Sequence, residues 1–453
     1  MNTRQNQIFY KYLVSNAAAM GGLMFGFDIA IISGTVPFLQ KHFALSELAL
    51  GWGVSSLLVG CMVGALVAGK ISDRLGRRRT LLSVAILFAG TSLMTALAGN
   101  FTLFVIARIL GGLAVGASSI LSPLYIAEIS PPADRGRLVT FNQLAITLGI
   151  LVSYFINYLL HNVGDDNWRW MFATGVFPSV IFFGLLCLAP ESPRWLYQHG
   201  RIDEARFILT RIGGEAAATQ EIQAMEKAHR VEPASSSFLL LRPEYRRLAW
   251  VGVALSILVQ SSGINTIIDY APIILKSAGN SIDGALFQTF VIGFINFGFT
   301  FVAIFTIDRI GRKPLYLIGA SGMAVSLTLL SAAFYLGHAT GYVGLVLILL
   351  FIAFFSACIG PVFWVLVSEI FPTKVRGAAM SLTVFTNWAA NTVVVLFFPH
   401  VLKQLGGGTT FGFLALMSVL MAVFTWVVIP ETKARSLEEI ETLWADRNHS
   451  SGH

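Results

Sequence analysis

Long apolar runs recur along the whole of this 453-residue chain, and they constrain its fold more than any other feature. A helix that crosses a bilayer needs about 20 mostly apolar residues. Twelve runs approach or exceed this length, at residues 9–38, 48–69, 80–99, 101–125, 137–160, 168–189, 247–276, 283–307, 314–336, 341–367, 377–402 and 409–429. Because a helix satisfies its own backbone polar groups in lipid, the sequence predicts an all-α membrane protein with twelve transmembrane helices.

The composition agrees with a membrane protein and argues against a soluble domain. Hydrophobic residues make up 55% of the chain and charged residues only 12%, whereas soluble domains carry about 25% charged residues. The three cysteines, Cys61, Cys187 and Cys358, all lie inside apolar runs. We therefore interpret them as small core residues and expect neither disulfides nor metal ligands among them.

The basic residues are distributed unevenly between the two sides of the predicted spans. All but five of the 31 Lys and Arg residues lie on the side that carries both termini; the five are Lys41, Arg108, Arg169, Lys276 and Lys403. The positive-inside rule assigns the basic side to the cytoplasm. This predicts a multi-pass protein of the cell (inner) membrane with cytoplasmic N- and C-termini. The same distribution accounts for the net charge of +7 without a nucleic-acid partner.

Short motifs repeat about 240 residues apart, in equivalent loops. DRLGR at 73–77 recurs as DRIGR at 308–312, AEISP at 127–131 as SEIFP at 368–372, and PES at 190–192 as PET at 430–432. Equivalent motifs in equivalent loops indicate two parallel structural repeats. The sequence therefore predicts two pseudo-symmetric six-helix bundles, at 1–189 and 247–429, with a cytoplasmic helical linker at 190–246 and a cytoplasmic tail at 430–453.

An acid and a base lie inside the predicted spans, where charged side chains are rare. Asp28 is near the middle of the first apolar run, and Arg108 is in the fourth. A charge at that depth costs a few kcal/mol or more, so we interpret the two residues as a functional pair. Its hold on a proton would depend on the distance between the two groups. The alternative is a buried carboxyl that only hydrogen-bonds a neighbouring helix.

The loop motifs resemble those of the sugar porters, a branch of the major facilitator superfamily. The similarity runs from about residue 8 to 441 and is carried by GKISDRLGRRR at 69–79, YIAEISPPADRGRL at 125–138, PESPRWL at 190–196, DRIGRKP at 308–314, GPVFWVLVSEIFPTKVRG at 360–377 and PETKARSLEEI at 430–440. The chain looks closest to bacterial proton/monosaccharide symporters and related glucose facilitators. This resemblance implies the major facilitator fold, with substrate bound between the two halves. It also matches Asp28 to the acid of proton-driven members, where passive facilitators commonly carry a neutral side chain.

The same loop motifs place acids beside bases at the cytoplasmic ends of the spans. We predict charge pairs between the halves that would close the inner face, formed by Asp73, Arg77, Glu128, Arg135, Arg137, Asp308, Arg312, Glu369 and Arg376. The alternative is that the basic residues serve topology alone, by holding these loops inside the cell.

Amide and aromatic side chains within the spans predict an uncharged, hydroxyl-rich ligand. Amides both donate and accept hydrogen bonds, as sugar hydroxyls do, and they are costly to bury unless they are used. By resemblance, the sugar-contacting positions are Gln143, Gln260, Asn265, Asn296, Trp364, Asn387 and Trp388, with Phe25 and Ile150 as apolar lining and Tyr270 as an outer-gate tyrosine. We also expect helix breaks near Ser261–Gly263 and at Gly360–Pro361.

The seventh apolar run departs from the sugar-porter pattern at two positions. Val259 replaces the first of a usual pair of glutamines, and Asp269 replaces the first of two adjacent tyrosines. We expect Asp269 to contact ligand hydroxyls or a cationic group and so to shift specificity away from common hexoses. The alternative is a hydrated acid at the outer mouth of the cavity.

Together these features predict symport of a proton with a monosaccharide (hexose or pentose) or a related polyol or cyclitol, by alternating access. We expect a monomer in the lipid bilayer, with the proton as coupling ion and no other cofactor. The alternatives are a passive facilitator that retains Asp28 for packing, and a transporter-like sugar sensor. An enzyme is disfavoured. The segment from Gly64 to Lys70 imitates a phosphate loop, but Ile71 occupies its hydroxyl position, and no histidine spacing suggests a metal site.

Overall fold

The computed structural model describes residues 3–130, 135–229, 240, 242–371 and 375–433. Almost all of these residues are helical and none of them lies in a β-strand, which confirms the predicted all-α class. The chain divides into two compact units, Met1–Phe38 with Ser56–Pro233 and Leu39–Ser55 with Ala234–His453. Residues 39–55 group with the second unit and residues 190–233 of the predicted linker group with the first, while the predicted bounds of bundles, linker and tail stay a prediction.

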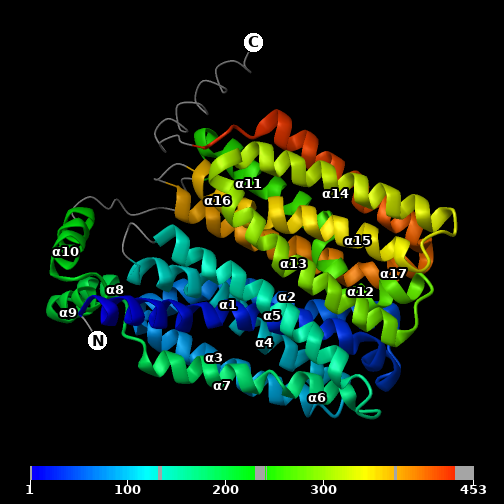
Figure 1. Ribbon diagram of the computed structural model, residues 1–453, viewed down its shortest axis with the longest axis horizontal. Coiled ribbons are helices and arrows are strands. Elements are labelled where there is room, and N and C mark those ends of the chain that lie inside the picture. The colour runs from blue at the N-terminus through cyan, green and yellow to red at the C-terminus, as the bar shows by residue number, and fades with distance from the viewer. Residues whose placement is uncertain (1–2, 131–134, 230–239, 241, 372–374, 434–453) are drawn as a thin grey trace. The chain divides into compact units, whose positions relative to one another are not determined.

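Six membrane-length spans form the first half of the chain. They are α1 (Thr3–His42), α2 (Glu47–Leu75), α3 (Arg77–Ala96), α4 (Phe101–Ile129), α5 (Arg135–Leu160), and α6 (Asn167–Ala173) together with α7 (Val176–Leu188). Within this half, α3 packs against both α4 and α7 (Figure 1).

Three short helices follow these spans, in the segment predicted to be a helical linker. They are α8 (Pro193–Gln198), α9 (Ile202–Gly213) and α10 (Glu215–His229). Ser192 begins α8 by accepting a hydrogen bond from the backbone N–H of Trp195. α9 buries Ala205, Ile208 and Ile212 on one face, as its helical spacing of apolar residues requires. Figure 1 shows the three helices gathered beside the N-terminal end of α1.

The second half of the chain contains the remaining spans. They are formed by α11 (Pro243–Ser261) with α12 (Ile264–Ser277), by α13 (Ile282–Ile310), by α14 (Arg312–Tyr335), by α15 (Tyr342–Phe354), the π-helix η2 (Phe355–Ile359) and α16 (Gly360–Ile370), and by α17 (Arg376–Val428). α17 holds two spans, because Gly406 breaks its helical geometry at φ 73° and ψ 168°. Counted over the described residues, the two halves therefore contain the twelve predicted spans. α14 and α17 lie side by side in Figure 1.

Two spans of the second unit are interrupted where the sequence predicts breaks. Gly263 adopts a left-handed conformation (φ 85°) between α11 and α12, which an L-residue adopts only at a cost. A Cβ added there would also lie 2.5 Å from Cδ1 of Leu414. In the tenth span the π-turn η2 lies directly before Gly360 and Pro361. Both interruptions leave polar side chains on irregular backbone inside a membrane span.

Glycines allow α1 and α5 to approach until their backbones are in contact. A Cβ added at Gly26 would lie 1.9 Å from the carbonyl oxygen of Ile146, and one at Gly149 would lie 2.1 Å from that of Leu23. No side chain can be accommodated at these distances. The contact places α5 directly against the part of α1 that carries Asp28.

Gly26→Ala is expected to destabilise the protein by about 1–3 kcal/mol, because the added methyl group must push apart two helix backbones. Gly90→Ala is the matched control on α3, where nothing lies within 4 Å of the added Cβ, and it should be neutral or mildly stabilising. Thermal unfolding of the two purified variants measures the difference. Equal unfolding temperatures would contradict the close contact between α1 and α5.

Candidate functional site

A buried ion pair joins α1 to α4 in the interior of the first unit. Nη1 of Arg108 lies 3.0 Å from Oδ1 of Asp28 and also donates to the backbone carbonyl of Asp28 at 3.2 Å. The side chain of Arg108 is 1% exposed and that of Asp28 is 13% exposed. The structure therefore brings together the acid and the base that the sequence predicts to form a pair.

Asp28 is the acid that compensates the buried positive charge of Arg108. Among the described residues, Nε and Nη2 of Arg108 have no hydrogen-bond partner, and the ring of Phe172 lies 5.5 Å from its Cζ. A buried charge that loses its only counter-ion costs about 3–5 kcal/mol. Gly111 leaves room for the carboxylate, because a Cβ there would lie 3.2 Å from Oδ2 of Asp28. A proton taken up by Asp28 must therefore compete with one strong and specific interaction.

The predicted lining residues of the first unit lie on the two helices that are in contact at Gly26. Phe25 is on α1, three residues before Asp28, while Gln143 and Ile150 are on α5, seven residues apart and so on one face. Phe25 and Gln143 are half-buried, and Ile150 is 6% exposed. Their contact with a sugar stays a prediction.

A chain of three amides forms in the second unit at the break between α11 and α12. Nε2 of Gln260 donates to Oδ1 of Asn387 at 2.9 Å, and Nδ2 of Asn265 donates to Oε1 of Gln260 at 2.7 Å. The left-handed turn at Gly263 allows Asn265 to reach back to Gln260. Gln260 and Asn387 are 6% and 4% exposed. Three of the predicted sugar-contacting residues are thus assembled, and they satisfy one another.

The other predicted residues of the second unit are placed separately from this amide chain. Asn296 on α13 accepts a hydrogen bond at 2.8 Å from Oγ of Ser356, which lies in the π-turn. Trp388 is buried next to Asn387 in sequence, whereas Trp364 is 38% exposed on α16. Nδ2 of Asn391, one turn beyond Asn387 on α17, has no hydrogen-bond partner among the described residues.

The two residues at the kink of α12 are both buried. Asp269 is 3% exposed, which contradicts the alternative of a hydrated acid, while its role in specificity stays a prediction. Tyr270 is fully buried, stacks on Phe398 with 5.4 Å between ring centroids, and donates to the carbonyl of Val395 at 3.1 Å. Tyr270 therefore ties α12 to α17 in this structure, and an outer-gate role stays a prediction.

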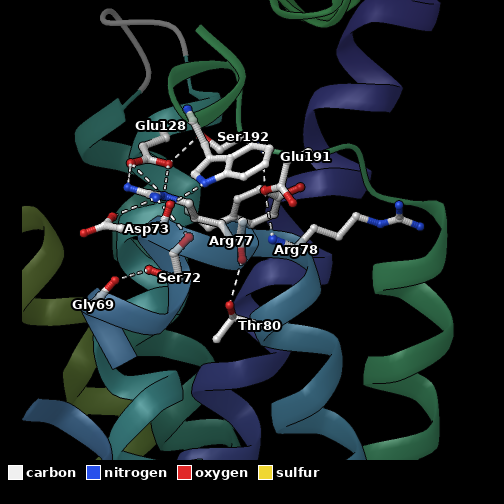
Figure 2. A network of polar contacts seen from close by, with 12 residues as sticks. Gly69, Ser72, Asp73, Arg77, Arg78, Thr80, Glu128, Glu191 and Ser192 are labelled. Atoms are coloured by element: carbon white, nitrogen blue, oxygen red, sulfur yellow. Dashed lines mark hydrogen bonds and ion pairs between the residues drawn. The ribbon is translucent and has the colours of Figure 1, made fainter. Parts of the chain in front are cut away.

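Figure 2 shows a polar network around Arg77 at one end of the first unit. Nε of Arg77 donates to Oε2 of Glu128 at 3.0 Å, and its Nη1 lies 2.9 Å from Oδ1 of Asp73. Ser192 donates to the same oxygen of Glu128 at 2.5 Å. Nε1 of Trp195 donates to the carbonyl of Asp73 at 2.9 Å. Side chains from α2, α3, α4 and the start of α8 are joined in this way.

The second unit repeats this network with its own residues. Nη2 of Arg312 donates to Oε1 of Glu369 at 3.1 Å, and Thr432 donates to the other oxygen of Glu369 at 2.6 Å. Arg376 uses its Nε to donate to the carbonyl of Phe371 at 3.2 Å.

The charge pairs that the structure shows lie within the units, and the predicted pairs between the halves stay a prediction. Arg77 pairs with acids of the first unit and Arg312 with an acid of the second. Each repeat thus folds its own motif-bearing loops together. The side chains of Arg135, Arg137 and Asp308, which complete the predicted gate, lie outside the described residues.

Two further acids accept hydrogen bonds from the first turns of the helices that carry these arginines. The sequence did not predict this role. Oε1 of Glu191 accepts from the backbone N–H of Arg78 at 3.0 Å. Glu431 likewise accepts from the backbone N–H groups of Arg312 and Lys313 at 3.0 and 3.1 Å. Both acids therefore cap a helix N-terminus, where a negative charge is favoured. The repeated Pro-Glu-Ser and Pro-Glu-Thr motifs were the available signal.

Comparison with known proteins gives a consistent result along the whole chain. A family model described as sugar (and other) transporter matches residues 14–444. The chain is 40% identical over 448 residues to the arabinose-proton symporter of Bacillus subtilis (strain 168), covering 98% of this chain and 97% of that protein. It is 41% identical to the D-xylose-proton symporter of Escherichia coli (strain K12), with the same coverage.

A solved structure also matches the fold. It is a partially occluded, inward-open conformation of the xylose transporter XylE from E. coli, and it resembles this chain with a TM-score of 0.85 and 39% identity. The match covers 94% of this chain and 99% of that structure.

Arg77→Gln is expected to destabilise the first unit by about 3–5 kcal/mol, because it leaves the buried carboxylate of Glu128 without its counter-ion. Arg74→Gln is the matched control, since Arg74 is exposed on the neighbouring helix turn. The double variant Arg77→Gln/Glu128→Gln should recover part of the loss, because it removes the unpaired charge. Thermal unfolding of the purified proteins is the measurement. Similar unfolding temperatures for Arg77→Gln and Arg74→Gln would argue against the network.

Proposed function

The chain belongs to the sugar transporter family of the major facilitator superfamily, and we propose that it carries a monosaccharide together with a proton across the membrane by alternating access. Relatives at 40% and 41% identity over nearly their whole length are named as arabinose-proton and D-xylose-proton symporters. A pentose or a hexose of similar size is therefore the proposed cargo.

The buried pair of Asp28 and Arg108 is the observation that carries the proposal of proton coupling. In its ionised form, Asp28 is held by Nη1 of Arg108 at 3.0 Å. A proton on Asp28 abolishes the ion pair and leaves Arg108 with the backbone carbonyl of Asp28 and the ring of Phe172. The two protonation states thus stabilise different separations of α1 and α4. A conformational cycle that changes this separation will change the affinity of Asp28 for a proton, and the reverse also holds.

The amide chain supports the proposal of an uncharged, hydroxyl-rich cargo. Gln260, Asn265 and Asn387 offer both donors and acceptors within one buried group. A sugar hydroxyl can replace either bond of Gln260 without leaving a polar group unsatisfied. Trp388, which follows Asn387 in sequence, is the aromatic residue that we propose for the C–H groups of a sugar ring.

We further propose that the carrier is a monomer in the lipid bilayer, with both termini in the cytoplasm and with the proton as its coupling ion and no other cofactor. The distribution of basic residues along the chain supports this orientation. A passive facilitator would use the same amide chain but would not need Asp28 to change its protonation state. A sugar sensor would bind cargo without moving it. Uptake of labelled sugar distinguishes a carrier from a sensor, and alkalinisation of the medium on addition of sugar distinguishes symport from passive transport.

Asp28→Asn is expected to abolish accumulation of labelled xylose or arabinose against a gradient, because an amide cannot take up the coupling proton. Counterflow exchange in the absence of a proton gradient should persist, since a neutral side chain still permits the conformational change. Reconstituted vesicles with an imposed acid-outside gradient provide the measurement, and Asp166→Asn, in an exposed loop, is the matched control. Active accumulation by the Asp28→Asn protein would falsify the coupling role.

Gln260→Ala is expected to weaken sugar binding about tenfold, which corresponds to the loss of one hydrogen bond inside a buried group. Gln288→Ala is the matched control, because Gln288 is also a buried amide of the second unit and pairs with Asn280 at 3.1 Å. Quenching of tryptophan fluorescence by xylose and arabinose measures the affinity. Equal losses in the two variants would place the sugar elsewhere.

A further inference from the structure

A cavity of about 600 Å³ lies at the end of the first unit, and neither residue of the buried ion pair is among its lining residues. It is lined by residues from the start of α1, the first turn of α3, the segment that follows α7, and helices α8 and α9. Its volume is in the range of small-molecule sites. None of its lining residues is proposed to bind the sugar or the proton, although Glu191 and Trp195 also belong to the contacts around the start of α3.

Two of the three carboxylates that line the cavity already accept hydrogen bonds. Glu204 pairs with Arg201 through two hydrogen bonds of 2.6 Å each, and this hydrogen bonding holds the pKa of Glu204 below its usual value. Glu191 accepts from backbone N–H groups, including the first turn of α3. Asp203, in the first turn of α9, also lines the cavity. Among the described lining residues it is the one carboxylate that takes part in neither of these sets of contacts.

Arg78 brings to the cavity a positive charge that forms no ion pair with a carboxylate among the described residues. Its Nε and Nη2 donate to the backbone carbonyls of Leu186 and Cys187 at 3.0 and 2.8 Å. Carbonyls position the guanidinium but do not neutralise it. Figure 2 shows this side chain extending away from the Arg77–Glu128 pair.

Two more guanidinium groups line the cavity without a carboxylate partner among the described residues. Arg211 on α9 stacks over the ring of Tyr10, with its Cζ 4.0 Å from the ring centroid, and lies 6.0 Å from the ring of Phe207. Stacking holds the plane of a guanidinium and leaves the N–H groups at its edge available for a forked contact. Arg79 is exposed at the start of α3. The lining contains four arginines, Arg78, Arg79, Arg201 and Arg211, and three carboxylates, Glu191, Asp203 and Glu204, so it carries one positive charge in excess.

We propose that this cavity binds a phosphate-type oxyanion, either a soluble phosphate monoester or the phosphate of an anionic lipid head group. Planar guanidinium groups recognise phosphate oxygens in pairs. An anion held by Arg78 and Arg211 together would tie α9 to the start of α3, and so would join the helices after the first bundle to that bundle. The inference rests on the cavity and its charges, not on the proposed transport activity.

The first experiment uses the full-length protein in nanodiscs of phosphatidylcholine, so that no anionic lipid is present. Inorganic phosphate and glycerol 3-phosphate are titrated by calorimetry, with sodium chloride at equal ionic strength as the control for general charge effects. The second experiment adds phosphatidylglycerol to the nanodiscs and counts the lipids that the protein retains by native mass spectrometry. The two experiments separate a soluble ligand from a lipid head group.

Arg211→Gln is the test variant and Arg206→Gln is its matched control. Both remove one positive charge from α9, but Arg206 does not line the cavity. Loss of one charge-assisted contact is expected to weaken binding about tenfold. Arg79→Gln provides a second test if Arg211→Gln lowers the unfolding temperature.

Saturable binding of phosphate or glycerol 3-phosphate that falls about tenfold in Arg211→Gln, and not in Arg206→Gln, would support a soluble ligand. Retention of phosphatidylglycerol with the same dependence on Arg211, and no binding of the soluble anions, would support a lipid head group. Absence of both kinds of binding would overturn the proposal. Equal weakening by the two variants would also overturn it, because the attraction would then be a general effect of net charge.

Discussion

The first unit encloses a carboxylate and a guanidinium together inside a membrane-spanning bundle. The charge of one cannot be removed without leaving the other buried and unpaired. Arg108 is 1% exposed and, of its hydrogen-bonding nitrogens, only Nη1 has a partner among the described residues. The position of Asp28 is set by the close contact of α1 with α5 and by the space that Gly111 leaves for its carboxylate. Any proton, ion or motion that reaches Asp28 therefore changes the free energy of Arg108 as well.

The two repeats use the same devices to hold their ends. In each unit an arginine follows a glycine with positive φ, pairs with a glutamate that also accepts from a hydroxyl, and begins a helix that another glutamate caps. The glycines are Gly76 and Gly311, and the capping acids are Glu191 and Glu431. Because these contacts close within one unit, they tie together the helices at the end of each bundle. A carrier that works by moving whole bundles needs this property.

The sequence predicted the features that depend on local pattern or on the cost of burial. Twelve spans, the break at Gly263 and the pairing of Asp28 with Arg108 follow from apolar length, helix-breaking residues and the cost of a charge in lipid. The partners of the loop charges did not follow, because motif spacing says that Arg77 lies near acids but not which bundle supplies them. The caps at Glu191 and Glu431 were also missed, since a helix cap formed by a residue more than 100 positions away has no local signature.

In both candidate sites the group that would receive cargo is already bonded to a protein group, and this affects how tightly the site can bind. A sugar that reaches Gln260 must replace its bonds to Asn265 and Asn387, so each new hydrogen bond contributes only the difference between two similar interactions. A proton that reaches Asp28 must likewise replace an ion pair at 3.0 Å. Tight binding would trap cargo inside a carrier, whereas exchange of one bonded state for another keeps the net free energy small. Binding groups that already have protein partners therefore suit a protein that must release what it binds on the opposite side of the membrane.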